Sequence, residues 1–460
     1  MAELIRHGTI VSNPEIILDI YLEQDEELLL MVLFDMECYW REDESTERLS
    51  VVYKVSGDSL RFVVSEKEIH FPKTLSSLSL ADAFDALCKK NMLTAFDLYK
   101  PMMLGKVKIE KPWGSEIWFT GIESRGICSV LGNSGIVAGE AKLPMLLAAA
   151  PKRLGFDTNR HPVLLKILDP FPEEVLGDLY FELHEEKSEV YIVTNIDNKA
   201  WLDGKGAIRM GFNQELRAKF DGDQAFRQGY LEAVKSYYLI RSKIDEINDA
   251  NKAILGLDIS ASIPEDLRKK LALNLPQDLV LAEKQTREQM HDFTCLNELI
   301  VGDVIKVPTY TPHALQHGVR TVEFQTPVYE RMILSFGQKV LSQSHWDTEE
   351  AVVKMKLDVE GAFNDLEVES DVDGVLSELV VEFEDFRVLR ISSQPGKSYS
   401  LVPRYSYQLL MVVQGELELS TTLLQSEQAC MIPASYPGGE LLNNNNEVMI
   451  FLLAQPRLLA

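Results

Sequence analysis

The segment Glu182-Leu183-His184-Glu185-Glu186-Lys187-Ser188-Glu189 decides how the fold of this chain and its chemistry are interpreted. Alternation along a β-strand puts Glu182 and His184 on one face and turns Leu183 toward apolar packing on the other. Glu189 follows five residues after His184, a distance that suits the next strand position after a tight bend. The segment therefore predicts two neighbouring strands that carry a carboxylate, an imidazole and a second carboxylate.

A second segment, Pro308-Thr309-Tyr310-Thr311-Pro312-His313, supplies one late histidine. It continues the apolar run at 304–307, so that His313 is expected near the start of a strand. Nitrogen and oxygen side chains of these kinds bind Zn²⁺, and also Mn²⁺ or Fe²⁺. The two segments together predict a divalent-metal site made of Glu182, His184, Glu189 and His313.

Each part of this pattern also has a less specific interpretation. A Glu-x-His pair inside an acidic run is often a solvated surface, and a single histidine such as His313 is more often packed or capping. Three further histidines could each be an alternative ligand, and the spacing does not decide the question for any of them: His161, His291 and His317.

The composition excludes several classes of protein. Apolar residues make up 46% of the 460 and charged residues 25%, which predicts roughly two to four globular domains. A net charge of −25 argues against a broad surface for nucleic acid or anionic membrane. The five cysteines form no CxxC pair, the first residues lack the order of a signal peptide, and no apolar run is long enough to span a membrane. These features predict a cytoplasmic protein with reduced thiols.

The N-terminal region has its own pattern of strands and helix. Residues 1–105 predict a small α+β unit, with strands over 28–34, 49–55 and 60–64 and a helix over 79–98 that begins at a Ser cap. No catalytic constellation is found in it, so that a docking or packing role is expected.

The rest of the chain is dominated by strand patterns. Residues 106–345 predict a β-barrel interrupted by a helical insertion over about 213–299. Residues 346–460 predict a second all-β unit. The expected fold class is therefore mainly β with an α insertion, in which two β-barrels follow the N-terminal α+β unit.

Several sequence elements occur in a fixed order between Lys111 and Arg331. They are Lys111-Pro112-Trp113-Gly114, the strand at 164–168, Glu182-x-His184 with Lys187-Ser188-Glu189, Gly302-Asp303 with Thr311-Pro312-His313, and Glu323-Phe324-Gln325 followed by Arg331. In this order they resemble the metal-dependent (class I) mannose-6-phosphate isomerases, which are cupins. The resemblance covers roughly half the chain. The chain departs from the family at Glu182, which replaces a glutamine, at Tyr310, which replaces a glycine, and in the additional unit at 1–105.

The resemblance implies a set of roles for the site. The ion is a divalent metal, with Zn²⁺ favoured, and the catalytic residues are Lys187, Glu323 and Arg331. Arg331 also contacts the substrate, with Lys166 and Lys339 as weaker candidates for binding its phosphate. The two barrels are expected to be cupin-like jelly rolls. The second barrel has Gln408 and Gly438 at the expected ligand positions and should hold no metal.

The implied activity is the interconversion of an aldose phosphate and a ketose phosphate, with a small hexose phosphate as the substrate. One alternative is a cupin that binds a carbohydrate or sugar phosphate without converting it. Another keeps the metal in a lyase or epimerase of related sugars. No nucleic acid or membrane is expected as a partner, and self-association into a homo-oligomer stays open.

Overall fold

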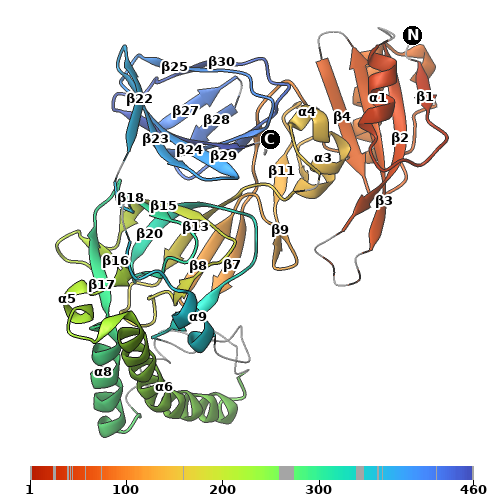
Figure 1. Ribbon diagram of the computed structural model, residues 1–460. Helices are drawn as coiled ribbons and strands as arrows, with labels where there is room; N and C mark the ends of the chain where they lie inside the picture. Colours follow the sequence, from red (N-terminus) through yellow and green to blue (C-terminus); the bar gives the residue numbers. More distant parts are fainter. Residues whose placement is uncertain are drawn as a thin grey trace. The chain divides into compact units, whose positions relative to one another are not determined.

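The computed structural model describes most of the chain (Figure 1). The described residues are 3–23, 27–38, 41, 43, 45–56, 59–73, 75–158, 160–257, 274–337, 347–359, 362–364, 366–420 and 422–457. Two compact units are present. The terminal unit comprises Met1–Ile109, Ile117–Lys166 and Leu366–Ala460, and the central unit comprises Glu110–Glu116 and Ile167–Asp365.

The N-terminal part of the terminal unit is a sheet in the order β1-β2-β3-β4-β5. Its strands are Leu4–Arg6, Leu28–Glu37, Thr46–Ser56, Ser59–Ser65 and Phe96–Asp97, and its helices are α1 (Glu15–Leu22) and α2 (Leu80–Asn91). The predicted strands are confirmed, as is the cap, since Ser79 accepts a hydrogen bond from the Asp82 N–H at 3.1 Å. The helix ends before the predicted residue 98, because Met92 turns into the left-handed region at φ 52° and closes the last turn.

The C-terminal part of the terminal unit is a second β structure. Its main sheet has the order β22-β23-β24-β31-β26-β29-β6, and the pairs β25-β30 and β27-β28 accompany it. The strands, in chain order from β6 and then from β22 to β31, are Met102–Met103, Glu367–Val372, Val375–Glu382, Phe386–Ser393, Ser398–Leu401, Gln408–Gln414, Glu416–Leu419, Thr422–Gln425, Ala429–Ile432, Gly439–Leu442 and Met449–Pro456. Apolar side chains from the main sheet and from both strand pairs share one core. We call this region, 366–457, the C-terminal sandwich.

The central unit holds the predicted metal residues between two sheets. One has the order β18-β15-β20-β13-β8-β7 and the other β17-β16-β19-β14-β21. The strands of the first sheet are Val304–Val307, Glu189–Ile196, Val319–Gln325, Leu164–Pro170, Gly114–Trp118 and Val107–Lys111; those of the second are Thr294–Leu299, Gly206–Phe212, His313–Leu315, Phe181–Leu183 and Met332–Ser335. Tyr191 and Ile305 of the first sheet and Ile208 and Leu315 of the second belong to one buried cluster. The two sheets therefore pack face to face.

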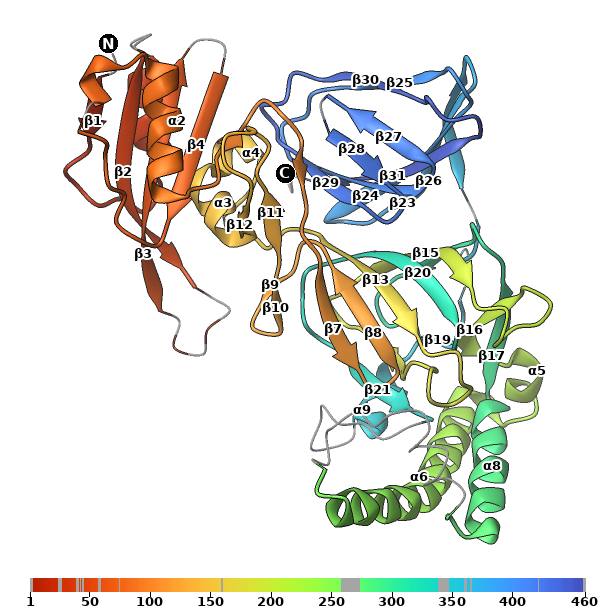
Figure 2. The same ribbon diagram turned by 180° about the vertical axis from the view of Figure 1, so that it is seen from behind.

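Helices cover the outer face of the second sheet. They are α5 (Gln214–Arg217), α6 (Gly222–Ile254), α8 (Gln277–His291) and α9 (Thr348–Lys354), and α6 and α8 lie side by side (Figures 1 and 2). Phe226 and Tyr230 of α6 pack with Leu183 and Ala314 of the sheet in what we call the helix-side cluster. The described part of the predicted insertion contains α5, α6 and α8, but its last residues form β17, which pairs with β16.

Helix α9, which follows the boundary expected at residue 345, belongs to the central unit. Ala351 and Val352 of α9 are buried in the helix-side cluster, and the central unit continues to Asp365. Met102 and Met103, which precede the boundary expected at 105, pair with β29 of the C-terminal sandwich.

The described helices include none that is both long enough and apolar enough to cross a membrane. All five cysteines are free thiols, as expected.

Candidate metal centre

His184 directly follows β14, and its ring is buried. Phe181 and Leu183 pack into the helix-side cluster, so that Glu182 and His184 face the other side of the sheet, as the alternation predicts. The Nδ1 atom of His184 lies 3.0 Å from the backbone oxygen of Glu330. This contact fixes the ring and directs its Nε2 atom toward the interior of the sandwich.

Glu189 and His313 are the first residues of β15 and β19. They come from different sheets, yet Glu189 Oε2 lies 3.1 Å from His313 Nε2. The Nδ1 atom of His313 lies 3.0 Å from the backbone oxygen of Thr311. Both histidines thus have Nδ1 at a carbonyl and Nε2 at the shared carboxylate, the orientation found in metal-ligating histidines.

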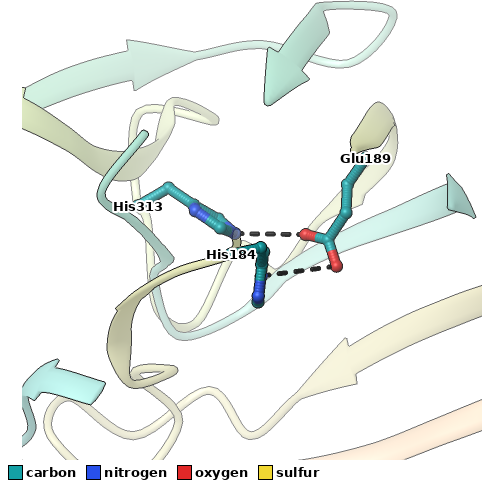
Figure 3. A group of neighbouring side chains, drawn as sticks. All are labelled: His184, Glu189 and His313. Carbon is teal, nitrogen blue, oxygen red and sulfur yellow. Dashed lines mark hydrogen bonds and ion pairs between the residues drawn. The ribbon is translucent and has the colours of Figure 1, made fainter. Parts of the chain in front are cut away.

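The three side chains form one compact cluster (Figure 3). Glu189 Oε1 lies 3.6 Å from His184 Nε2, and the potential ligand atoms all lie within 4.8 Å of one another. Glu182 Oε1 lies 3.8 Å from His184 Nε2, and Glu182 pairs in register with His313. The structure therefore brings together all four residues predicted from the sequence, with Glu182 at the edge of the cluster.

Burial and neighbouring charges set the protonation states here. Burial alone would raise the pKa of Glu189, but Lys187 and the two histidines together hold that pKa well below its usual value. Burial would likewise raise the pKa of Glu182, but Arg331, Lys187 and the two histidines together outweigh burial and lower that pKa. Burial and the Lys187 ammonium lower the pKa of His184. The cluster thus presents charged carboxylates with a neutral His184 near pH 7.

These residues fit a divalent ion. The Nε2 atom of His184 is buried and has no hydrogen-bond partner among the described residues. A buried acceptor without a partner is costly unless something else binds it. Two imidazoles and one or two carboxylates are a donor set that Zn²⁺, Mn²⁺ and Fe²⁺ accept.

Three further residues assigned from the resemblance lie close to the cluster. Lys187 Nζ lies 2.6 Å from Glu189 Oε1. Arg331 Nη1 lies 3.5 Å from Glu182 Oε2, and its guanidinium stands over the ring of Tyr180. Glu323 is buried on β20 and faces Tyr191 of β15 across the sheet register.

The remaining predicted residues include one whose position the structure does not describe. Lys166 is buried on β13, and Lys339 lies outside the described residues. Of the alternative ligands, His317 stacks on Trp201 and has its Nδ1 atom 2.7 Å from Asp178 Oδ1. His161 and His291 are also absent from the ligand cluster found in the described part of the chain.

Two residues that the sequence did not single out hold the centre in place. The Tyr191 hydroxyl donates to Glu189 Oε2 and lies 3.0 Å from His313 Nε2. Glu330 Oε2 accepts hydrogen bonds from the N–H groups of Glu185 and Glu186. Tyr191 carries a detectable signal, since it lies two residues after Glu189 on the same strand face.

The Tyr310 side chain lies away from the metal cluster. Its φ of 64° lies in the left-handed region that favours glycine, and its N–H donates to His184 O at 2.6 Å. The side chain packs against the helix-side cluster, on the opposite face of the sheet from His313.

No family model matches this chain, and no curated protein matches it. Solved structures do match it. The mannose 6-phosphate isomerase from Bacillus subtilis has a TM-score of 0.51 and 14% identity over 77% of this chain and 99% of that chain. A phosphomannose isomerase mutant from Salmonella typhimurium has a TM-score of 0.53 and 11% identity over 78% and 100%. A zinc-bound mannose 6-phosphate isomerase has a TM-score of 0.52 and 11% identity over the same shares.

The structural matches establish a shared fold. Identities this low leave the activity open. The chain therefore shares the fold of the mannose-6-phosphate isomerases and places a buried cluster of histidine and glutamate inside it.

Proposed function

We propose that this chain is a metal-dependent sugar-phosphate isomerase that interconverts the aldose and ketose forms of a hexose phosphate. The buried cluster of His184, Glu189 and His313 is the observation that carries the proposal, because its Nε2 and carboxylate atoms converge and His184 Nε2 has no hydrogen-bond partner among the described residues. The shared fold supports the reaction class.

In this proposal, His184, Glu189 and His313 hold the ion, and Glu182 supplies a fourth ligand. Zn²⁺ is preferred because it accepts this donor set and because one matching isomerase structure contains zinc. The bound ion supplies Lewis-acid polarisation of the sugar oxygens. The carbonyl groups behind both Nδ1 atoms keep the imidazoles in the tautomer that leaves Nε2 free to bind.

Proton transfer between the two sugar carbons falls to groups beside the ion. We assign this work to Lys187 and Glu323, and a well-placed acid or base contributes roughly 10²–10⁴ in rate. Lys187 is buried against Glu189, which keeps its ammonium next to the cluster. Arg331 is assigned to the substrate, as its planar guanidinium suits a phosphate or hydroxyl pair. Lys166 and Lys339 remain weaker candidates for the phosphate.

The same proposal covers the architecture. Both β structures are interpreted as cupin-like barrels, of which only the one in the central unit binds metal. A non-catalytic carbohydrate-binding protein is the competing interpretation. It is favoured by the ion pair between Arg331 and Glu182, which engages the substrate-contacting residue with a metal ligand.

Solvent exchange separates the two interpretations. The metal-loaded protein is incubated with hexose 6-phosphates in deuterated water, and deuterium at C1 and C2 is followed by NMR. An isomerase incorporates solvent deuterium and forms the other sugar, and His313→Ala does neither. Sugar phosphates that raise the unfolding temperature without any exchange would instead support binding alone.

A further inference from the structure

A cavity lies on the helix-covered side of the central unit, between the start of β17 and helix α8. It has a volume of about 660 Å³ and opens to solvent. Helix α8 ends at His291 and leads directly into strand β17, which begins at Thr294 (Figure 1). Its lining includes Arg209, Arg287, His291, Lys284 and Asn213.

The cavity is separate from the metal cluster. On β16, Ile208 and Met210 are buried between the two sheets, so that Arg209 between them faces the opposite side. Met210 pairs in register with His313, whereas Arg209 pairs with Ala314, which belongs to the helix-side cluster. The cavity and the metal ligands therefore lie on opposite faces of one sheet.

A bulge in β16 helps to aim Arg209. The register with β17 shifts between Arg209 and Phe212, and Gly211 within this shift has a φ of 70°. Bulges of this kind redirect a side chain and are frequent beside functional sites.

The positive groups of the cavity are unequally paired. Arg287 lies 3.1 Å from Glu174 and 3.2 Å from Glu283, so that its charge is already compensated. Arg209 donates to the neutral hydroxyl of Thr294 at 2.8 Å and has no ion pair to a carboxylate among the described residues.

His291 stands beside these guanidinium groups. Burial, together with Arg209 and Arg287, lowers the pKa of His291 to about 3. Arg209 and Arg287 thus bring two positive charges to this end of the cavity, and the Asp178 carboxylate opposes them. An anion placed there gains chiefly from Arg209, because Arg287 is already paired with two carboxylates.

The rim of the cavity carries both hydrogen-bond acceptors and hydrogen-bond donors. Glu288 and Asp292 offer carboxylates, and Asn213 offers a side-chain amide. The carboxylates accept hydrogen bonds from hydroxyl groups, and the amide can donate to them. A ligand with one anionic end and several hydroxyls matches this distribution better than a simple ion does.

We propose that this cavity is a second ligand site, which binds a small phosphorylated polyol with the phosphate at Arg209 and the hydroxyls at the carboxylate rim. The site is independent of the proposed isomerase activity, because its residues lie on the other face of the sheet.

Calorimetric titration of the metal-loaded Arg331→Gln variant tests the proposal, with inorganic phosphate and glucose 6-phosphate as probes. This background removes the phosphate contact proposed for the metal site. Both probes should still bind saturably, with glucose 6-phosphate the tighter one. Adding Arg209→Gln should weaken binding about tenfold or more, because a charge-assisted hydrogen bond is lost.

Two further variants control the measurement. Lys205→Gln removes one exposed charge at the start of β16, where Lys205 pairs with Glu298, and should leave binding unchanged. Lys284→Glu reverses a charge on the exposed rim, where folding is not at risk, and should also weaken binding. Absence of saturable binding in the Arg331→Gln background would overturn the proposal. An affinity that neither Arg209→Gln nor Lys284→Glu changes from that background would overturn it as well.

Discussion

The sandwich of the central unit and the C-terminal sandwich are both packed β structures, yet their interiors differ in kind. The central sandwich buries two histidines and a glutamate whose ligand atoms converge. The C-terminal sandwich is filled by aliphatic and aromatic side chains. A packed β architecture of this kind can therefore hold either a cluster of metal-ligating side chains or an apolar core, depending on which residues occupy a few inward-facing positions.

The two positions predicted to have lost their ligands illustrate how the C-terminal sandwich is closed. Gln408 is buried, accepts from Gln455 Nε2 at 3.0 Å and donates to Val402 O at 3.3 Å, so that its amide is used structurally. Gly438 has a φ of 91°, and a Cβ there would lie 2.7 Å from Leu401 O. A histidine at residue 438 is therefore excluded by the backbone itself.

The largest expected effect is the loss of metal from the central sandwich. His184→Ala or His313→Ala should reduce the bound ion from about one per chain to nearly none, because each removes a direct ligand of a site that needs three or four. Elemental analysis of the purified protein measures this. Gln408→Ala, at the expected acidic ligand position of the C-terminal sandwich, should leave the metal content unchanged. Equal metal content in all three variants would contradict the comparison.

The second prediction concerns the closed backbone of the C-terminal sandwich. Gly438→Ala should destabilise it by about 1–3 kcal/mol beyond the cost of the left-handed φ, because the new Cβ meets backbone and Pro403. Gly396→Ala is the matched control, since Gly396 has a φ of 72° with no atom near its Cβ position. Its cost should be about 1 kcal/mol. Chemical unfolding measures the free energy of unfolding of both variants. Equal losses of stability would show that a Cβ at residue 438 meets no steric obstacle.

The third prediction concerns the support of the metal ligands. Tyr191→Phe removes the hydroxyl that contacts both Glu189 and His313, and should weaken metal affinity by about 10–100-fold. Competition with a chelator measures the affinity. Tyr436→Phe removes a buried hydroxyl from the C-terminal sandwich and should not change it. An unchanged affinity in Tyr191→Phe would assign the hydroxyl to packing alone.

The smallest effect concerns acid stability of the central unit. Burial alone would raise the pKa of Asp178, but His317 outweighs it, so that the folded pKa lies below the unfolded value of about 3.9. The resulting stability is present above that unfolded value and disappears as the pH falls through the folded pKa. Asp178→Asn should cost about 1–3 kcal/mol at pH 7 and less near pH 3.

Urea unfolding of the metal-free protein at both pH values measures this difference. Asp371→Asn, at an exposed position on β22, is the control and should change stability at neither pH. If Asp178→Asn lowers the free energy of unfolding by the same amount at both pH values, the charge of Asp178 does not cause the effect.

Local sequence patterns predicted much of this arrangement. Period-two alternation around Leu183 placed Glu182 and His184 on one face, and the apolar run before Pro308 placed His313 at a strand start. The predictions failed where tertiary context decides. The helix after Ser79 ends early at a left-handed Met92, and the residues after His291 pair with β16 instead of continuing the helix. The contact of the Tyr191 hydroxyl with His313 depends on the packing of two sheets against each other. No local sequence pattern predicts that packing.

The central claim is that one divalent ion binds to His184, Glu189 and His313. Anomalous diffraction from crystals of the zinc-loaded protein, recorded at the zinc edge, tests it most directly. We expect a single strong peak within about 2.0–2.2 Å of both Nε2 atoms and of a Glu189 carboxylate oxygen. A zinc-loaded crystal with no peak there, or with its peak at other residues, would contradict it.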